Sequence, residues 1–188
     1  MNNQDQHWIA ATQKWLKTII IEYSICPFAK REMERGSIFY TVSHERKIKN
    51  CLQQLLQECE RLNTDANIET TLLIYAGAFS LFDDYLDFLA MAEDVLIDEG
   101  YEGIYQLASF HPDYYFNESD RDDAANYTNR SPYPMLHLLR ETSIDRAVST
   151  YPDTDAIPER NVDLTRQLGL AKMKTLLAAC YPQFDRSE

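Results

Sequence analysis

Residues 70–76 read Thr-Thr-Leu-Leu-Ile-Tyr-Ala, an unbroken run of apolar and β-branched side chains that ends at Gly77. A strand without polar alternation is typical of a sheet whose two faces are both covered by helices. The run therefore predicts a buried strand, and the segments on either side of it predict how the sheet is completed.

Helical periodicity flanks this run on both sides. From Ile48 to Leu62 apolar side chains recur at i, i+3, i+4 and i+7, which predicts a helix with one buried face. Downstream, Ser80 and Asp83 resemble a capping box that opens a second helix, and Gly100 marks its end.

Short β-prone runs at residues 38–42 and 104–110 predict two further strands. Residues 38–110 thus predict a β-α-β-α-β core, which favours an α/β fold with a small parallel or mixed sheet covered by helices. The alternative is an α+β arrangement, a ferredoxin-like two-layer sandwich.

The segments outside this core are predicted to be mainly helical. Residues 5–24 predict an amphipathic helix, and residues 111–188 predict a loop and helical region. Within that region we expect a loop at 112–134, a helix at 135–150, a loop at 151–161 and a helical stretch interrupted by Gly169. Because no repeat and no flexible linker is visible, a single domain over residues 1–188 is expected.

The composition is that of an ordinary globular chain. Of the 188 residues, 45% are hydrophobic and 26% are charged, which argues against general disorder. The first twenty residues do not read as a signal peptide, and no apolar run approaches the roughly 20 residues that span a bilayer. We therefore expect a cytoplasmic protein without a membrane partner.

The charge is concentrated in one stretch. The formal net charge is −12, and residues 83–123 hold thirteen acidic residues and one basic residue, so the remainder is neutral. A field of this sign repels phosphate backbones, so nucleic acid is not expected as a partner. A solubilising acidic face is the simplest interpretation, and a surface for a cation or a basic protein is the alternative.

The segment Ser109-Phe-His-Pro-Asp follows the last predicted strand directly. Ligands of open α/β sheets gather beyond the carboxyl ends of strands, so His111 is a candidate general acid or base. Its unperturbed pKa suits that role, and Asp113 or Glu141 is expected to fix its tautomer. Alternatively, His111 only hydrogen-bonds to the loop beneath it.

The segment Asn129-Arg-Ser-Pro-Tyr-Pro precedes the predicted helix 135–150. Ser131 is a candidate N-cap with Pro132 at the first helical position, and a helix N-terminus offers free N–H donors to an anion. The Arg130 guanidinium suits a carboxylate or phosphate. Asn129, Arg130 and Ser131 therefore predict a cradle for a small anion, unless Arg130 forms an internal ion pair.

On the same predicted helix, His137 and Glu141 lie four residues apart, with Arg140 beside them. Arg140 is a further candidate for binding the anion. Together with His111, His137 and Glu141 could instead hold a metal ion, although Arg140 would repel a cation. A buried polar network is the third possibility, and no cofactor is specified.

Two further segments carry candidate polar groups. In Ile157-Pro-Glu-Arg-Asn, Arg160 could add a second cation to the cradle or pair with Glu141, and Asn161 could add a hydrogen bond. In Ile25-Cys-Pro-Phe-Ala, Cys26 ends the first predicted helix. Thiolates are activated at helix N-termini, so a packed thiol is favoured there over a nucleophile.

Four segments carry a resemblance to a known family. They are Cys26-Pro-Phe-Ala, Ser109-Phe-His-Pro, Asn129-Arg-Ser-Pro-Tyr-Pro with Leu136-His-Leu-Leu-Arg-Glu, and Ile157-Pro-Glu-Arg-Asn. Over nearly the whole chain, the sequence resembles an uncharacterised bacterial family, domain of unknown function 1415. The resemblance implies a bacterial origin and shared motifs, but it implies no reaction.

Three functions stay open at this point. The first is an enzyme or carrier for a small anionic metabolite, with His111 as acid or base and Arg130 and Arg160 as anion-binding groups, which requires that these three meet around one hollow. The second is a non-catalytic adaptor that uses the aromatic loop 114–133 and the acidic segment. The third is a metal-binding protein that uses His111, His137 and Glu141. The oligomeric state is not predicted.

Overall fold

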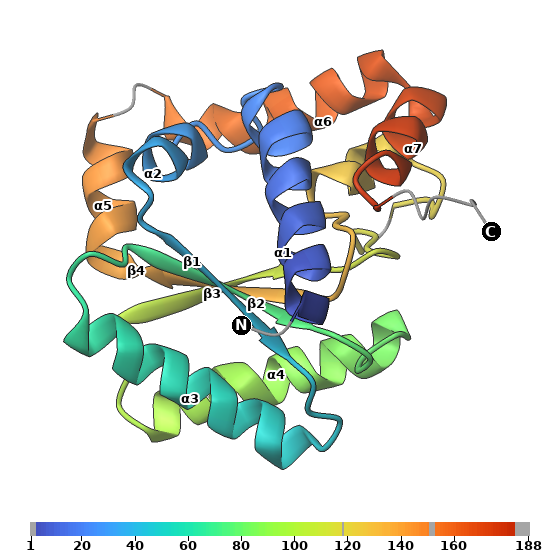
Figure 1. Ribbon diagram of the computed structural model, residues 1–188. Coiled ribbons are helices and arrows are strands. Elements are labelled where there is room, and N and C mark those ends of the chain that lie inside the picture. The colour runs from blue at the N-terminus through green and yellow to red at the C-terminus, as the bar shows by residue number, and fades with distance from the viewer. Residues whose placement is uncertain (1–2, 118, 151–152, 183–188) are drawn as a thin grey trace.

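The computed structural model describes residues 3–117, 119–150 and 153–182 (Figure 1). Its centre is a four-stranded sheet formed by β1 (Ile38–Ser43), β2 (Thr70–Tyr75), β3 (Tyr105–Phe110) and β4 (Met135–Arg140). The strand order is β1-β2-β4-β3. Since β1 runs parallel to β2 while β4 runs antiparallel to both β2 and β3, the sheet is mixed, as the sequence allowed.

Helices cover both faces of the sheet. The crossover helices α3 (Ile48–Thr64) and α4 (Phe82–Asp98) lie beneath one face, and the helices near the two ends of the chain lie over the other (Figure 1). The predicted β-α-β-α-β core is therefore confirmed. The ferredoxin-like two-layer alternative is wrong, because such a sandwich leaves one sheet face without helices.

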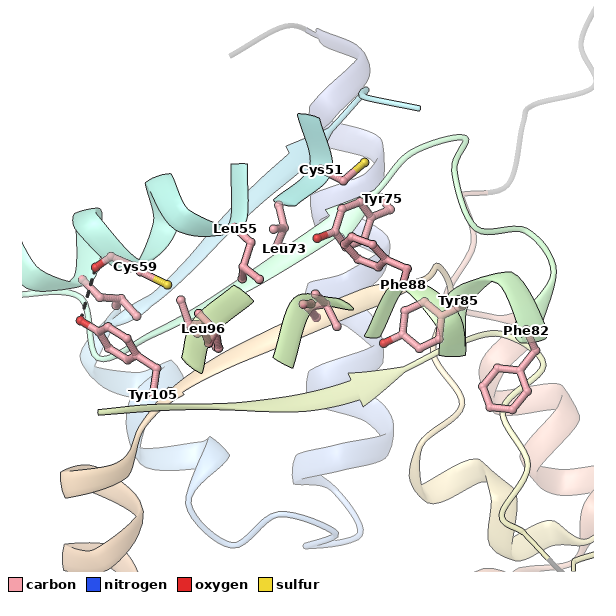
Figure 2. Packing of buried hydrophobic residues seen from close by; sticks show 14 residues of the cluster. Cys51, Leu55, Cys59, Leu73, Tyr75, Phe82, Tyr85, Phe88, Leu96 and Tyr105 are labelled. Atoms are coloured by element: carbon pink, nitrogen blue, oxygen red, sulfur yellow. Dashed lines mark hydrogen bonds between the residues drawn. The ribbon is translucent and has the colours of Figure 1, made fainter. Parts of the chain in front are cut away.

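Strand β2 explains how one short segment organises two hydrophobic cores. All six of its residues are buried. Because successive side chains of a strand point to opposite faces, Leu73 and Tyr75 pack with α3 and α4, while Leu72 and Ile74 pack in the core on the other face. Figure 2 shows the first of these cores, where the Tyr105 hydroxyl donates to the Cys59 carbonyl.

The helix predicted from residue 135 to about residue 150 is wrong in its first part. Residues Met135–Arg140 form β4, and α5 (Glu141–Thr150) begins only after them. His137 lies opposite Leu72 on one neighbouring strand and Ala108 on the other. A segment of six residues, here Met-Leu-His-Leu-Leu-Arg, is too short for its periodicity to separate strand from helix. Pairing with two strands at once determines the outcome here.

The N-terminal helix begins and ends slightly earlier than predicted and is less regular. Helix α1 (Asn3–Trp15) continues as a π-helix, η1 (Leu16–Ile21), in which the Glu22 N–H donates to the Lys17 carbonyl at 3.1 Å. A short helix that was not predicted, α2 (Ala29–Arg35), follows. Helix α4 starts at Phe82 without a side-chain cap on its N-terminus, so the predicted capping box is wrong.

The C-terminal region is helical, as expected. It contains η3 (Thr154–Ala156), α6 (Ile157–Leu168) and α7 (Leu170–Ala178), and the break at Gly169 is confirmed. Helix α6 begins inside the predicted loop 151–161, of which residues 151–152 lie outside the described residues. The predicted loop 112–134 contains one short 3-10 helix, η2 (Ala124–Thr128). Within the described ranges, no helix is long and apolar enough to cross a membrane.

Candidate functional site

His111 lies at the exit of β3 and is fully buried. The Asp113 backbone N–H donates to Nδ1 at 3.0 Å, so Nδ1 is unprotonated and Nε2 donates to the Phe79 carbonyl at 2.9 Å. The ring packs against Phe82 and Tyr85 of α4. Burial lowers the pKa of His111, which favours the neutral ring. Both ring nitrogens are therefore bonded to main-chain groups.

The tautomer of His111 is fixed by the main chain rather than by a carboxylate. Asp113 contributes its backbone N–H, while the residue itself is exposed. Glu141 lies at the far end of β4, where its N–H donates to the Ile104 carbonyl at 3.0 Å. For this ring to transfer a proton to a substrate, it would first have to give up one of its two hydrogen bonds.

Of the three segments that the enzyme hypothesis requires to meet, those around positions 111 and 130 come together. The His111 N–H donates to the Asn129 carbonyl at 3.3 Å, and the Ser131 N–H donates to the His111 carbonyl at 3.4 Å. The Asn129 side chain donates to the Ser109 carbonyl at 3.2 Å. These bonds extend the β3 side of the sheet into the following loops.

Arg130 binds main-chain carbonyls. Its Nε donates to Tyr114 at 2.9 Å and its Nη2 to Arg121 at 2.8 Å, while the guanidinium lies 4.8 Å from the centre of the Tyr127 ring. No carboxylate pairs with it among the described residues. Ser131 donates to the Tyr133 carbonyl at 2.6 Å, and because a strand follows, the predicted helix N-cap is wrong.

Asn126 organises the same loop, although it was not among the residues predicted from the sequence. The residue is fully buried. Its Oδ1 accepts from the Phe116 N–H at 3.1 Å and from the Ser119 hydroxyl at 2.9 Å, and its Nδ2 donates to the Asp120 carbonyl at 2.8 Å. An asparagine between apolar neighbours, Ala125 and Tyr127, was the available signal, since a buried amide requires partners.

His137 and Glu141 do not share a helix face, because His137 is in a strand. The Thr70 hydroxyl donates to the Leu138 carbonyl at 2.6 Å, so His137 Nε2, at 2.7 Å from that hydroxyl, acts as the donor to it. Desolvation lowers the pKa of His137 to about 4. In the described ranges no group of three His, Cys, Asp or Glu side chains is placed to hold a metal ion.

Arg140 also binds carbonyls and ties β4 to α3. Its Nη2 donates to Leu62, near the end of α3, and to Ile68 at 3.0 Å. The guanidinium lies 6.0 Å from the centre of the Tyr105 ring. This side chain therefore closes the connection between α3 and β2.

Arg160 and Asn161 hold the turn that precedes α2. Arg160 Nη2 donates to the Ser24 carbonyl and, at 2.9 Å, to Asn161 Oδ1. The buried Asn161 donates to the Ile25 carbonyl at 2.8 Å. Cys26 follows in this turn; burial raises the pKa of its thiol, and the Phe28 and Ala29 N–H groups oppose that rise.

The candidate residues thus form two clusters rather than one. The first joins residues 109–114 with 126–131, and the second joins 24–26 with 160–161. In the described part of the chain, no hydrogen bond or ion pair links Arg160 to His111 or Arg130. A hollow of about 560 Å³ beside Arg160 is also lined by Glu159 and Asp163, and His111 does not line it.

The outer surface of α4 has a different character. Its sequence contains six acidic residues and no Lys or Arg, and all six acids are exposed. At 100° per residue, one stripe contains Asp83, Asp87, Asp94 and Asp98, and the stripe beside it contains Leu86, Ala90 and Ile97. Leu86 and Ile97 are 40% and 53% exposed.

Taken together, the fold and these clusters define an α/β protein with a mixed four-stranded sheet, in which the motif residues hold loops and turns through main-chain carbonyls. The chain belongs to the DUF1415 family, whose model, described as a protein of unknown function, matches residues 7–175. Comparison with curated proteins finds no match. Comparison with solved structures finds none either.

Proposed function

We propose that this protein is a non-catalytic interaction protein that docks a basic amphipathic helix of a partner protein on the outer surface of α4. The observation that carries the proposal is the pair of adjacent stripes on that helix, one acidic and one apolar. A partner helix with an apolar stripe beside a Lys- or Arg-rich stripe is complementary to both.

The acidic side chains of α4 have no basic partner among the described residues. None of the ion pairs among the described residues involves an acid of this helix. The acidic stripe runs from Asp83 to Asp98, or about 22 Å at 1.5 Å per residue. Such a stripe favours fast association with a basic surface, and the exposed Leu86 and Ile97 supply apolar area for a stable contact.

The contacts of the candidate catalytic residues support this choice over an enzyme. His111 uses both ring nitrogens on main-chain groups, and the guanidinium groups of Arg130 and Arg160 bind carbonyls. These interactions stabilise loops without requiring a substrate. We place the interaction in the bacterial cytoplasm, which agrees with four cysteines that are all free thiols.

The test is calorimetric titration with a synthetic Leu/Lys amphipathic peptide of about 16 residues, long enough to cover the stripe. A variant with Asp83→Asn, Asp87→Asn, Asp94→Asn and Asp98→Asn should bind about tenfold more weakly, since several modest charge contacts are lost. The matched control changes four exposed acids elsewhere by the same charge (Glu22→Gln, Glu60→Gln, Asp155→Asn, Asp163→Asn), and its affinity should stay close to that of the natural chain.

Apolar recognition is tested separately with Ile97→Ser, which should weaken binding about fivefold through lost burial. Equal weakening by the α4 variant and its control would show that the peptide responds only to net charge, and would refute the proposal. So would equal binding of a scrambled peptide of the same composition. A dimer of the natural chain that Ile97→Ser dissociates would assign the surface to a second copy instead.

A further inference from the structure

A second hollow, of about 580 Å³, lies on the opposite side of the sheet from α4. Its lining comes from three elements that are distant in sequence: the end of α1 with η1, the helix α2, and the edge strand β1 (Figure 1). Among the lining residues are Lys14, Lys17, Glu32, Met33, Ile38 and Tyr40.

One wall of this hollow is formed by the segment in which the first helix changes from α-helical to π-helical geometry. Lys14 lies in α1, and Lys17 lies in η1. π-helical turns are rare and occur frequently at functional sites, because they widen the helix and redirect side chains. Here the irregular turn carries the exposed Lys17, and the exposed Lys14 lies just before it in α1, so that both lysines line the hollow.

The two lysines have no counter-charge in the described part of the chain. Neither forms an ion pair there. The one carboxylate of the lining, Glu32, accepts from the Ser37 hydroxyl at 2.6 Å and lies 3.5 Å from Arg31 and 3.7 Å from Arg35. Like charges three residues apart on a helix repel each other, so an anion between Lys14 and Lys17 would remove a destabilising contact.

The opposite wall offers a donor and apolar surface. The hydroxyl of the half-buried Tyr40 makes no hydrogen bond within the described residues, and burial raises its pKa to about 12, so it stays protonated and able to donate. Met33 and Ile38 supply apolar contacts. Gly36, at φ 66° and with open space where a Cβ would stand, leaves the floor clear.

We propose that this hollow binds a small organic anion, whose carboxylate or phosphate head contacts Lys14 and Lys17 and whose apolar body lies against Met33 and Ile38. Tyr40 donates a hydrogen bond to the same head. The volume lies within the range of about 300–1,000 Å³ that small-molecule sites occupy. This site is independent of the docking surface proposed on α4, so each can fail without the other.

The experiment is NMR titration of the full chain with benzoate, phenyl phosphate, benzyl alcohol and inorganic phosphate. Benzoate or phenyl phosphate should shift the amide signals of residues around Lys14, Lys17 and Tyr40. The variant Lys14→Gln/Lys17→Gln should bind at least about tenfold more weakly, and Tyr40→Phe about fivefold. The control Lys47→Gln/Lys49→Gln removes the same charge from exposed lysines outside the hollow and should bind normally.

The probes separate the parts of the proposal. Binding of phenyl phosphate without benzoate, or the reverse, supports it and identifies the head group. Binding of benzyl alcohol as tight as that of benzoate would overturn it, because the lysines would then play no part. If inorganic phosphate bound as tightly as phenyl phosphate, the proposed role of the apolar wall would be wrong. If neither organic anion shifted the amide signals, the proposed site would be wrong.

Discussion

Replacement of His111 tests whether this buried ring serves the fold or a reaction. His111→Asn keeps an acceptor near the position of Nδ1 and so can retain the bond from the Asp113 N–H, but it loses the bond to the Phe79 carbonyl. His111→Gln can reach the Phe79 carbonyl but does not provide the Nδ1 acceptor. His111→Ala loses both bonds and leaves a cavity beside Phe82 and Tyr85.

The expected losses follow from these contacts. Each buried group left without a partner costs about 1–2 kcal/mol, so the Asn and Gln variants should each lose that amount of unfolding free energy. His111→Ala should lose about 4 kcal/mol once the cavity is included. For a chain of this length, 1 kcal/mol lowers Tm by about 2–4 °C, so Tm of the Ala variant should fall by about 8–16 °C.

Urea unfolding near neutral pH, followed by far-UV circular dichroism, measures these differences. His7→Ala is the control, because His7 is exposed on α1 and its loss should change the free energy of unfolding by less than about 0.5 kcal/mol. If His111→Ala were as stable as the natural chain, the structural interpretation of its hydrogen bonds would be wrong and a catalytic role would regain support.

Two more predictions concern the buried polar groups. Burial lowers the pKa of His111 and His137 in the folded chain, that of His137 to about 4, and so keeps both rings neutral. Below about pH 6.5 the unfolded chain therefore binds more protons than the folded chain. The free energy of unfolding should be highest above that pH and should fall as the pH drops toward 4. In urea unfolding across this range His137→Gln should flatten the decline, and an unchanged slope would contradict the assignment. Asn126→Ala removes the hydrogen bonds of a buried amide and should cost about 2–4 kcal/mol, with faster amide exchange at Phe116. Unchanged exchange there would show that the loop does not depend on this amide.

The sheet core could be predicted because its signals are local and long enough. The helix beginning at Ile48 has a buried stripe that repeats over about three turns, and the run from Thr70 consists of apolar and β-branched residues without interruption. Strand β4 and the π-helical turn η1 have no such signal. The six residues of β4 suit a strand or a helix equally, and the distinction comes from pairing with β2 and β3, which are distant in the chain.

Only part of the candidate site could be predicted, again because contacts between segments distant in the chain determine the rest. Sequence indicates which side chains can bind an anion, but it does not show which main-chain carbonyls the fold leaves without partners. Arg130 reaches the carbonyls of Tyr114 and Arg121, and Arg160 reaches that of Ser24. A guanidinium has five N–H donors in a planar fork, so it suits two carbonyls from a loop as well as it suits one carboxylate.

The arginines that stabilise loops thus differ from the charged side chains that we expect to bind a partner or a ligand. The guanidinium groups of Arg130, Arg140 and Arg160 lie over loops and helix ends, where they replace water as donors to carbonyls that regular secondary structure leaves open. Among the described residues, the aspartates of α4 on one side of the sheet and the lysines of α1 and η1 on the other take part in no ion pair, and apolar side chains lie beside each group. Because only uncommitted charges can respond to a ligand without breaking the fold, these two surfaces rather than the four sequence motifs are where binding is expected.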